Sequence, residues 1–221
     1  MKASSLALAL LATTSVEAGQ WDITLAPYLW LEMPSAKTVL AESGSDVRLQ
    51  TVTQLEAVAS NGDWSLVGDI NYLRAVDQVF GASELEVTGA SAAVGVLREI
   101  SNGPMHVMTA GIGLRHFDLA IKLRTPSGNL RADKLLLTPF IGVRGRYDLG
   151  KHMSVEGSLG IGGLGRGADF YSDLRAGVGF KTGRSSSVQL GYRHVFVDLD
   201  KSTFVSSFTL EGPYVAYVHK F

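Results

Sequence analysis

The sequence has no cysteine among its 221 residues, which excludes a disulfide scaffold, thiol catalysis and cysteine-ligated zinc. Proline is also scarce, at 6 residues. Neither sign of charge dominates, because 20 Lys and Arg oppose 21 Asp and Glu, so we expect no nucleic-acid partner. Beyond the first 18 residues no run of about 18 uncharged apolar residues occurs, which excludes a transmembrane helix.

Glycine, in contrast, is abundant, with 25 residues, and hydrophobic residues make up 46% of the chain. This composition argues against disorder and suits a β-rich protein.

The first 18 residues have the layout of a secretory signal peptide. Lys2 supplies the positive charge, residues 6–12 form a short apolar run, and residues 16–18 precede a cleavage site between Ala18 and Gly19. We therefore predict a signal peptide over residues 1–18 and one exported domain over residues 19–221.

The exported part shows apolar and polar residues in alternation, which is typical of β-strands. One face of the segment 64–72 carries Trp64, Leu66, Ile70 and Tyr72, and the opposite face carries Asp69 and Asn71. Residues 135–148 and 153–163 alternate in the same way.

Turn residues divide the chain into hairpins. Tight turns are predicted at residues 61–63, 101–104, 150–152 and 183–186, with polar or irregular connections at residues 33–46, 75–84, 125–129, 165–169 and 198–202. This spacing predicts an antiparallel up-and-down β-barrel of about ten strands, with eight as the alternative. Short turns are typical of the periplasmic side of a membrane barrel, so we assign the tight turns to the periplasm.

The barrel could be soluble, with an apolar interior, or membrane-spanning, with an apolar exterior and a polar lumen. Strand length and aromatic residues near strand ends favour the membrane. The expected interfacial aromatics are Trp21, Trp30, Trp64, Tyr72, Tyr147 and Tyr217. The expected lumen charges lie opposite the large apolar residues: Glu56, Asp69, Arg115, Arg144, Arg146, Glu156, Asp173, Arg175 and Arg193.

Several segments resemble a family of proteobacterial outer-membrane β-barrel proteins with no assigned activity. Residues 25–30 are similar to its first strand and residues 63–72 to its third. The other matching segments are residues 113–115, 138–144, 191–193 and 212–221, together with Asp198. The resemblance implies a ten-stranded meander and residence in the outer membrane.

The final segment, with Val215, Tyr217 and Phe221 on one face, resembles the signal that barrel assembly machinery recognises. We expect that machinery and outer-membrane lipid as partners.

Other motifs suggest chemistry only weakly. Residues 160–165 spell G-x-G-x-x-G, but the next segment alternates like a strand, whereas a dinucleotide site needs a helix there. The five His residues form no metal-binding pattern, so we expect no metal and no cofactor.

Lipid-modifying and proteolytic barrels carry a His with Ser or an acid near the outer rim. The candidates here are His194, Asp198, Asp200, Ser202, Ser206 and Ser207.

His194 and Asp198 lie four residues apart on one strand, at roughly 13 Å, which is too far for a direct pair. We therefore expect that this protein is not an enzyme.

The leading hypothesis is an outer-membrane barrel with a structural or binding role and a polar lumen plugged by paired charges. A narrow path for a small solute or ion through the same lumen is the alternative, and an enzyme acting on lipid is a third.

Overall fold

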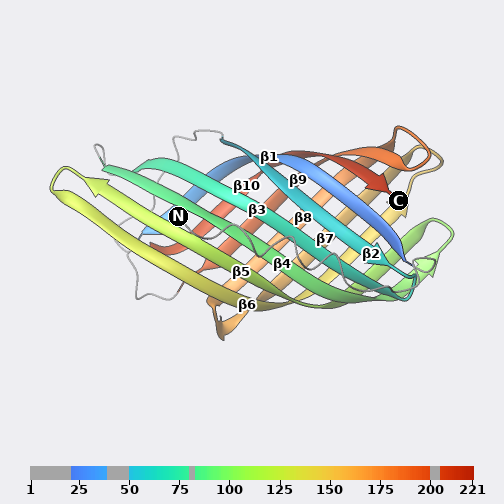
Figure 1. Cartoon of the computed structure of the whole chain (residues 1–221), viewed down its shortest axis with the longest axis horizontal. Coiled ribbons are helices and arrows are strands. Elements are labelled where there is room, and N and C mark those ends of the chain that lie inside the picture. Colours follow the sequence, from blue (N-terminus) through green and yellow to red (C-terminus); the bar gives the residue numbers. More distant parts are fainter. Residues whose placement is uncertain (1–20, 39–49, 80–82, 200–204) are drawn as a thin grey trace.

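The computed structural model describes residues 21–38, 50–79, 83–199 and 205–221. Over these ranges the chain forms ten antiparallel strands that close into one barrel, in which β1 pairs with β10 (Figure 1). The predicted up-and-down β-barrel is therefore confirmed. The expected signal peptide, residues 1–18, lies outside the described residues. Within the described ranges, no helix is long and apolar enough to cross a membrane.

The strands contain between 11 and 21 residues. They are β1 (Asp22–Thr38), β2 (Gln50–Ser60), β3 (Trp64–Val79), β4 (Ser83–Gly103), β5 (His106–Thr125), β6 (Gly128–Asp148), β7 (Met153–Arg166), β8 (Ala168–Lys181), β9 (Ser186–Asp198) and β10 (Val205–Lys220). About 9–11 tilted residues cross a bilayer, so the longer strands extend past it.

Each of the four predicted tight turns overlaps a turn of the structure, although β4 continues to Gly103, so that the second turn is residues 104–105 and not 101–104. Between β2 and β3, the Asn61 side-chain oxygen accepts the Trp64 N–H at 2.8 Å. Gly62 adopts a φ of 95° there, a conformation that favours glycine. These turns all lie at one end of the barrel, which we call the tight-turn end.

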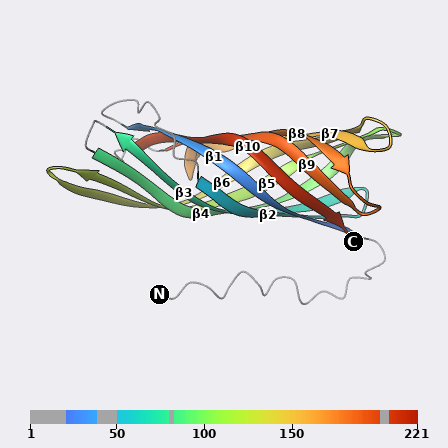
Figure 2. The ribbon, with the colours of Figure 1, turned by 90° about the horizontal axis from the view of Figure 1, so that it is seen from above.

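At the opposite end, the hairpin of β5 and β6 projects beyond its neighbours (Figures 1 and 2). The two strands pair from His106↔Tyr147 to Thr125↔Gly128, whereas β6 pairs with β7 only from Phe140 to Asp148. The far half of β6 therefore extends past the end of β7.

Two of the predicted irregular connections begin later than expected. β1 continues to Thr38, and β3 continues to Val79 and pairs there with Ser83 of β4. In β3 and β4 the reason is that charged residues share one face of the continuing sheet. For example, Arg74 and Glu86 lie 3.6 Å apart across β3 and β4. Residues 39–49, 80–82 and 200–204 lie outside the described residues.

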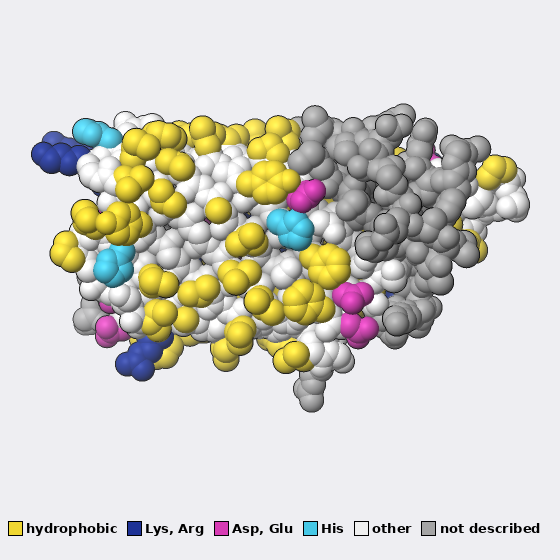
Figure 3. Space-filling model, turned by 180° about the vertical axis from the view of Figure 1, so that it is seen from behind, with side chains coloured by type: hydrophobic (Ala, Val, Ile, Leu, Met, Phe, Trp, Pro, Cys, Tyr) yellow, Lys and Arg dark blue, Asp and Glu magenta, His cyan; other side chains and the backbone are white. Residues whose placement is uncertain are grey.

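The outer wall on the tight-turn side is apolar (Figure 3). Large side chains such as Ile70, Ile112 and Ile141 are at least half exposed. Trp64, Tyr72, Tyr147 and Tyr217 are also exposed, as expected for interfacial aromatics. Because the charged side chains described below lie inside, the barrel has the inverted polarity of a membrane protein.

Trp30 does not belong to this outer set, which corrects the sequence prediction. It is 1% exposed and faces the lumen, where its indole Nε1 donates to the carbonyl of Gly212 at 3.1 Å. In β1 the alternating residues Ala26, Tyr28 and Trp30 are all buried, while Leu29 and Leu31 are exposed. Strand parity, and not proximity to a strand end, decides where Trp30 points.

Gly212 allows this packing and generates the first prediction. Its φ is +152°, and a Cβ there would clash with the Leu31 carbonyl of β1. We expect Gly212→Ala to lower the free energy of unfolding by about 1–3 kcal/mol, because the backbone conformation becomes strained. Urea unfolding in lipid vesicles measures this effect. The control is Gly68→Ala, where the nearest atom lies 4.0 Å from the new Cβ. Equal losses in both variants would contradict the prediction.

Candidate functional site

The candidate site is a set of seven charged side chains packed across the lumen, which we call the lumen cluster. Its members are Glu56, Asp69, Arg115, Arg144, Asp173, Arg175 and Arg193. They come from β2, β3, β5, β6, β8 and β9, so the cluster joins strands that are far apart in the sequence.

Asp69 on β3 is the most connected acid of the cluster. Its carboxylate accepts hydrogen bonds from Arg115 at 3.2 Å, Arg193 at 3.2 Å and Arg175 at 3.4 Å. The side chains of Asp69, Arg115 and Arg193 are 6%, 6% and 1% exposed. A carboxylate this buried would be costly without charged partners.

Asp173 on β8 forms a bidentate ion pair with Arg193. The guanidinium donates from Nε to Oδ1 at 3.0 Å and from Nη2 to Oδ2 at 2.6 Å, which is the geometry of a strong ion pair. Arg115 also donates to Asp173, at 3.1 Å. Asp69 and Asp173 therefore share two arginines, and the four groups form a closed ring of contacts.

Glu56 on β2 pairs with the two remaining arginines. Arg144 donates to its Oε1 at 2.7 Å and Arg175 to its Oε2 at 2.6 Å. Because Arg175 also reaches Asp69, it connects Glu56 to the ring around Asp173.

Arg146 and Glu156, also expected in the lumen, lie nearer the tight-turn end and form a separate group. Arg146 donates to Glu156 at 3.1 Å and to Asp148 at 2.9 Å. Its side chain is 39% exposed, so solvent screens these pairs more than those of the lumen cluster. The structure thus places all nine expected charges inside the barrel but brings only seven of them into one cluster.

Neutral polar side chains that the sequence analysis did not single out complete the cluster. The Tyr28 hydroxyl donates to Asp69 at 2.8 Å and accepts from Arg175 at 3.0 Å and from Arg193. The Asn71 amide donates to Asp69 at 2.6 Å and to Ser91 at 3.2 Å. Asn71 could have been found, because it shares strand parity with Asp69. The sequence did not indicate that Tyr28 faces inward, because tyrosine is equally typical of the aromatic belt on the outside of a membrane barrel.

Aromatic rings contact the arginines of the cluster. The guanidinium of Arg193 lies 5.0 Å from the Trp30 ring, and that of Arg175 lies 4.9 Å from the Tyr28 ring. Arg115 lies 5.5 Å from the ring of Tyr171. Cation–π contacts of this kind stabilise desolvated cations, so the rings compensate part of the cost of burying the arginines.

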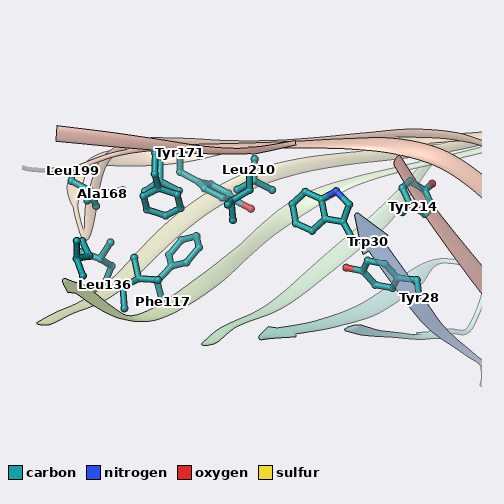
Figure 4. Close-up of a cluster of buried hydrophobic side chains, with 14 of the residues drawn as sticks. Tyr28, Trp30, Phe117, Leu136, Ala168, Tyr171, Leu199, Leu210 and Tyr214 are labelled. Atoms are coloured by element: carbon teal, nitrogen blue, oxygen red, sulfur yellow. The ribbon is translucent and has the colours of Figure 1, made fainter. Parts of the chain in front are cut away.

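Toward the far end the lumen is apolar, which corrects the prediction of a polar lumen. Buried side chains from several strands pack together there (Figure 4), and we call them the apolar plug: Phe117, Leu119, Ile121, Leu123, Leu136, Ala168, Val195, Val197, Leu199, Phe208 and Leu210. Val195 and Val197 share strand parity with Arg193. The lumen is therefore polar toward the tight-turn end and apolar toward the far end.

A cavity of about 90 Å³ adjoins the lumen cluster. Its lining combines charged residues of the lumen cluster with Phe140 and several glycines, and the charged residues are Glu56, Asp69, Asp173, Arg115, Arg144 and Arg175. A Cβ at Gly142 or Gly160 would lie 3.4 Å or 3.5 Å from the Phe140 ring, so the ring lies close against the wall. The G-x-G-x-x-G segment, residues 160–165, belongs to this wall and to the end of β7, and strand β8 follows it.

The residues considered for catalysis do not form a site among the described residues. His194 lies on the outer face, with its Nε2 3.9 Å from a Glu211 carboxylate oxygen, which is beyond hydrogen-bond distance. Asp198 pairs in register with Phe170 and Ser207. Asp200 and Ser202 lie outside the described residues. Within the described ranges no group of three or more His, Asp or Glu side chains could hold a metal ion.

The expected assembly residues lie on the outer face at the tight-turn end. Val215, Tyr217 and Phe221 are 40%, 48% and 71% exposed. The Phe221 N–H donates to the carbonyl of Ile23 at 2.8 Å, which fastens the last residue to β1.

No protein-family model and no curated protein matches this chain. Among solved structures, the outer membrane protease OmpT from Escherichia coli is 9% identical over 91% of this chain and 96% of its own, with a TM-score of 0.50. Neisserial surface protein A is 10% identical over 91% and 97%, with a TM-score of 0.43. The β-domain of the Bordetella autotransporter BrkA is 13% identical over 90% and 99%, with a TM-score of 0.41.

At such low identity the likeness concerns the fold alone. Together with the closed ten-stranded topology, it shows that the chain has the fold of outer-membrane β-barrels.

The lumen cluster generates the second prediction. Asp69→Asn removes the carboxylate that three arginines share, and we expect a loss of about 3–5 kcal/mol in the free energy of unfolding, because buried cations lose their partner. Urea unfolding in lipid vesicles measures it. Asp133→Asn is the matched control, since the Asp133 side chain is 62% exposed and its pair with Arg131 should contribute about 0–1 kcal/mol. Equal unfolding midpoints for the two variants would contradict a stabilising role of the cluster.

Proposed function

We propose that this chain is an integral outer-membrane barrel, exported with a cleaved signal peptide, that has a structural or binding role and no catalytic activity. Its lumen is closed to the flow of ions. The observation that carries the proposal is the pairing of Glu56, Asp69 and Asp173 with four arginines from opposite walls.

Two physical barriers support a closed lumen. The first is the lumen cluster, in which each carboxylate oxygen accepts at least one hydrogen bond from an arginine. An ion that passed through would have to break these desolvated pairs, which is costly. The second is the apolar plug, where Leu119, Ile121 and Val197 are fully buried. A dry apolar constriction prevents conduction because it cannot solvate an ion.

The third prediction tests closure directly. The purified, folded protein in a planar lipid bilayer is expected to show no stable single-channel steps, and Arg144→Ala and Arg175→Ala are expected to add none, because the apolar plug remains. Insertion is verified by heat-modifiable migration on gels before recording. Stable steps in the wild-type protein whose size shifts in either variant would contradict closure. They would favour the alternative of a narrow path in which arginines filter anions.

We also propose that barrel assembly machinery recognises Val215, Tyr217 and Phe221 on the closing strand. β10 pairs with β1 from Thr24↔Lys220 to Thr38↔Val205, and until it does so both strands have open edges. Fast recognition of the last strand would limit aggregation through these edges.

The fourth prediction separates recognition from stability. A fully buried Phe contributes roughly 1.5–3 kcal/mol by transfer from water, and Phe221 is 71% exposed, so its stabilising effect should be smaller. We expect Phe221→Ala to reduce the folded barrel in cells sharply and to leave folding of the purified chain into lipid nearly unchanged. The control is Leu149→Ala, which removes another exposed apolar side chain at the tight-turn end.

The comparison is between the yield in membranes and the gel-shifted fraction in vitro. Equal losses in both assays would assign Phe221 to stability, and normal yield in both would contradict the recognition role.

A further inference from the structure

The far half of β6 has one side without a neighbouring strand. β6 pairs with β5 along its whole length and without a register shift. Its pairing with β7 begins only at Phe140↔Gly162, so among the described strands none pairs with the other side of β6 between Gly128 and Pro139. Figures 1 and 2 show this part of the β5–β6 hairpin projecting beyond the barrel. We call the β6 backbone of residues 129–135, on the side away from β5, the free edge.

The parity of β6 shows which backbone groups point to the free edge. Residues of an antiparallel strand bond alternately to the neighbours on its two sides. Pro139 has no N–H, yet the β5–β6 ladder continues past it, so the odd-numbered residues of β6 point away from β5. The free edge therefore presents the N–H and C=O groups of Asn129, Arg131, Asp133 and Leu135. Within the described ranges no backbone group pairs with them on that side.

The free edge lies outside the bilayer. Arg131 and Asp133 point outward with side chains that are 63% and 62% exposed, and such charges on the lipid face of a barrel would be destabilising. Open sheet edges also do not occur within the hydrocarbon region, because no water is present there to bond the free backbone groups. The free edge is at the end opposite the tight turns, so it faces the cell exterior when the tight turns face the periplasm.

Elsewhere the chain blocks strand edges with proline. The β1–β10 ladder is interrupted at Pro27 and at Pro213, and both belong to strands that have an open edge until the barrel closes. A proline on an edge has no N–H to offer and so prevents pairing with another chain. Pro139 has this place at the base of the free edge, but residues 129–135 contain no proline. The free edge is therefore regular and open to pairing with a strand.

The side chains beside the free edge define the strand that it would accept. On the outer face, Arg131 and Asp133 are followed by Leu135 and Leu137, which are 73% and 56% exposed. In antiparallel pairing, an acid opposite Arg131 and a base opposite Asp133 form favourable cross-strand pairs. Apolar residues opposite the two leucines remove apolar surface from water. From its N-terminus, the outer face of the added strand would then read apolar, apolar, basic, acidic.

We propose that the free edge binds an extended segment of a partner protein as an added antiparallel strand with this pattern. A row of unpaired backbone groups gives affinity in such strand addition, and the alternate side chains give specificity. Two copies of this chain in one membrane have their β6 strands running toward the same side of the bilayer, which excludes antiparallel pairing between them. The proposal names a partner class for the proposed binding role and rests on it.

The first test measures binding of a fluorescein-labelled peptide, Val-Thr-Val-Thr-Lys-Thr-Glu-Val-Thr, to the folded full chain in lipid nanodiscs by fluorescence anisotropy. We expect saturable binding of this peptide and none of a scrambled one. Leu135→Pro should weaken binding about tenfold, because it removes an N–H from the free edge and leaves the β5 ladder intact. Leu135→Ala is the matched control, which keeps the N–H and should weaken binding less. Equal losses in the two variants would overturn strand addition.

The second test exchanges the charges. The double variant Arg131→Asp, Asp133→Arg keeps opposite charges two residues apart, but it should weaken the peptide about fivefold or more because like charges then face each other. A peptide with Lys and Glu exchanged should bind this variant as the first peptide binds the wild type. If both proteins bind both peptides equally, the partner pattern is wrong.

The third test, hydrogen exchange followed by NMR, needs no variant. The amides of Arg131, Asp133 and Leu135 should exchange rapidly in the free protein, and those of Ala132 and Lys134, which point to β5, slowly. The peptide should slow only the first set. Slow exchange of the first set without peptide would mean that the free edge is already covered, by this chain or by a second copy, and would overturn the proposal.

Bilayer recording keeps this proposal apart from the closed lumen. A closed barrel that shows no saturable binding of the peptide refutes only the strand addition. A conducting barrel that binds the peptide refutes only the closed lumen.

Discussion

The carboxylate of Asp69, held by Arg115, Arg175 and Arg193 inside the barrel, imposes the strictest constraint on this structure. These four residues come from β3, β5, β8 and β9, and each strand must present the correct face for the contacts to form. A shift of one residue in any strand would turn its charge toward lipid and leave the partners unpaired. The register of the barrel and the pairing of its charges therefore depend on each other.

The division of the lumen into two halves follows from this arrangement. Charges gather toward the tight turns, where exposed Arg146 and Asp148 remain in contact with solvent. Toward the far end the same strands bury apolar residues, which form a core that needs no solvent. The rings of Trp30, Tyr28 and Tyr171 contact the guanidinium groups of the charged half. The filled lumen is packed like the core of a globular protein, and it contains one layer of charged side chains.

Function in a barrel of this kind depends on individual sites and much less on the fold, because one fold can support unrelated activities. In this chain the described residues place the lumen cluster inside the barrel, and the outward face of β3, β4 and β5 carries a second group of ion pairs toward the far end, among them Arg74–Glu86 and Arg124–Glu86.

The sequence by itself determined the strand alternation, the positions of the tight turns and the inward face of residues such as Asp69 and Arg193, because strand parity is a local property. It could not show that Tyr28 and Trp30 face inward, since aromatic residues suit both a lipid interface and a packed lumen. Only the tertiary structure decided which charges meet and that Val195 and Val197 close the far half. Those outcomes depend on which strands lie opposite one another once the barrel closes, and no local pattern encodes contacts across the lumen.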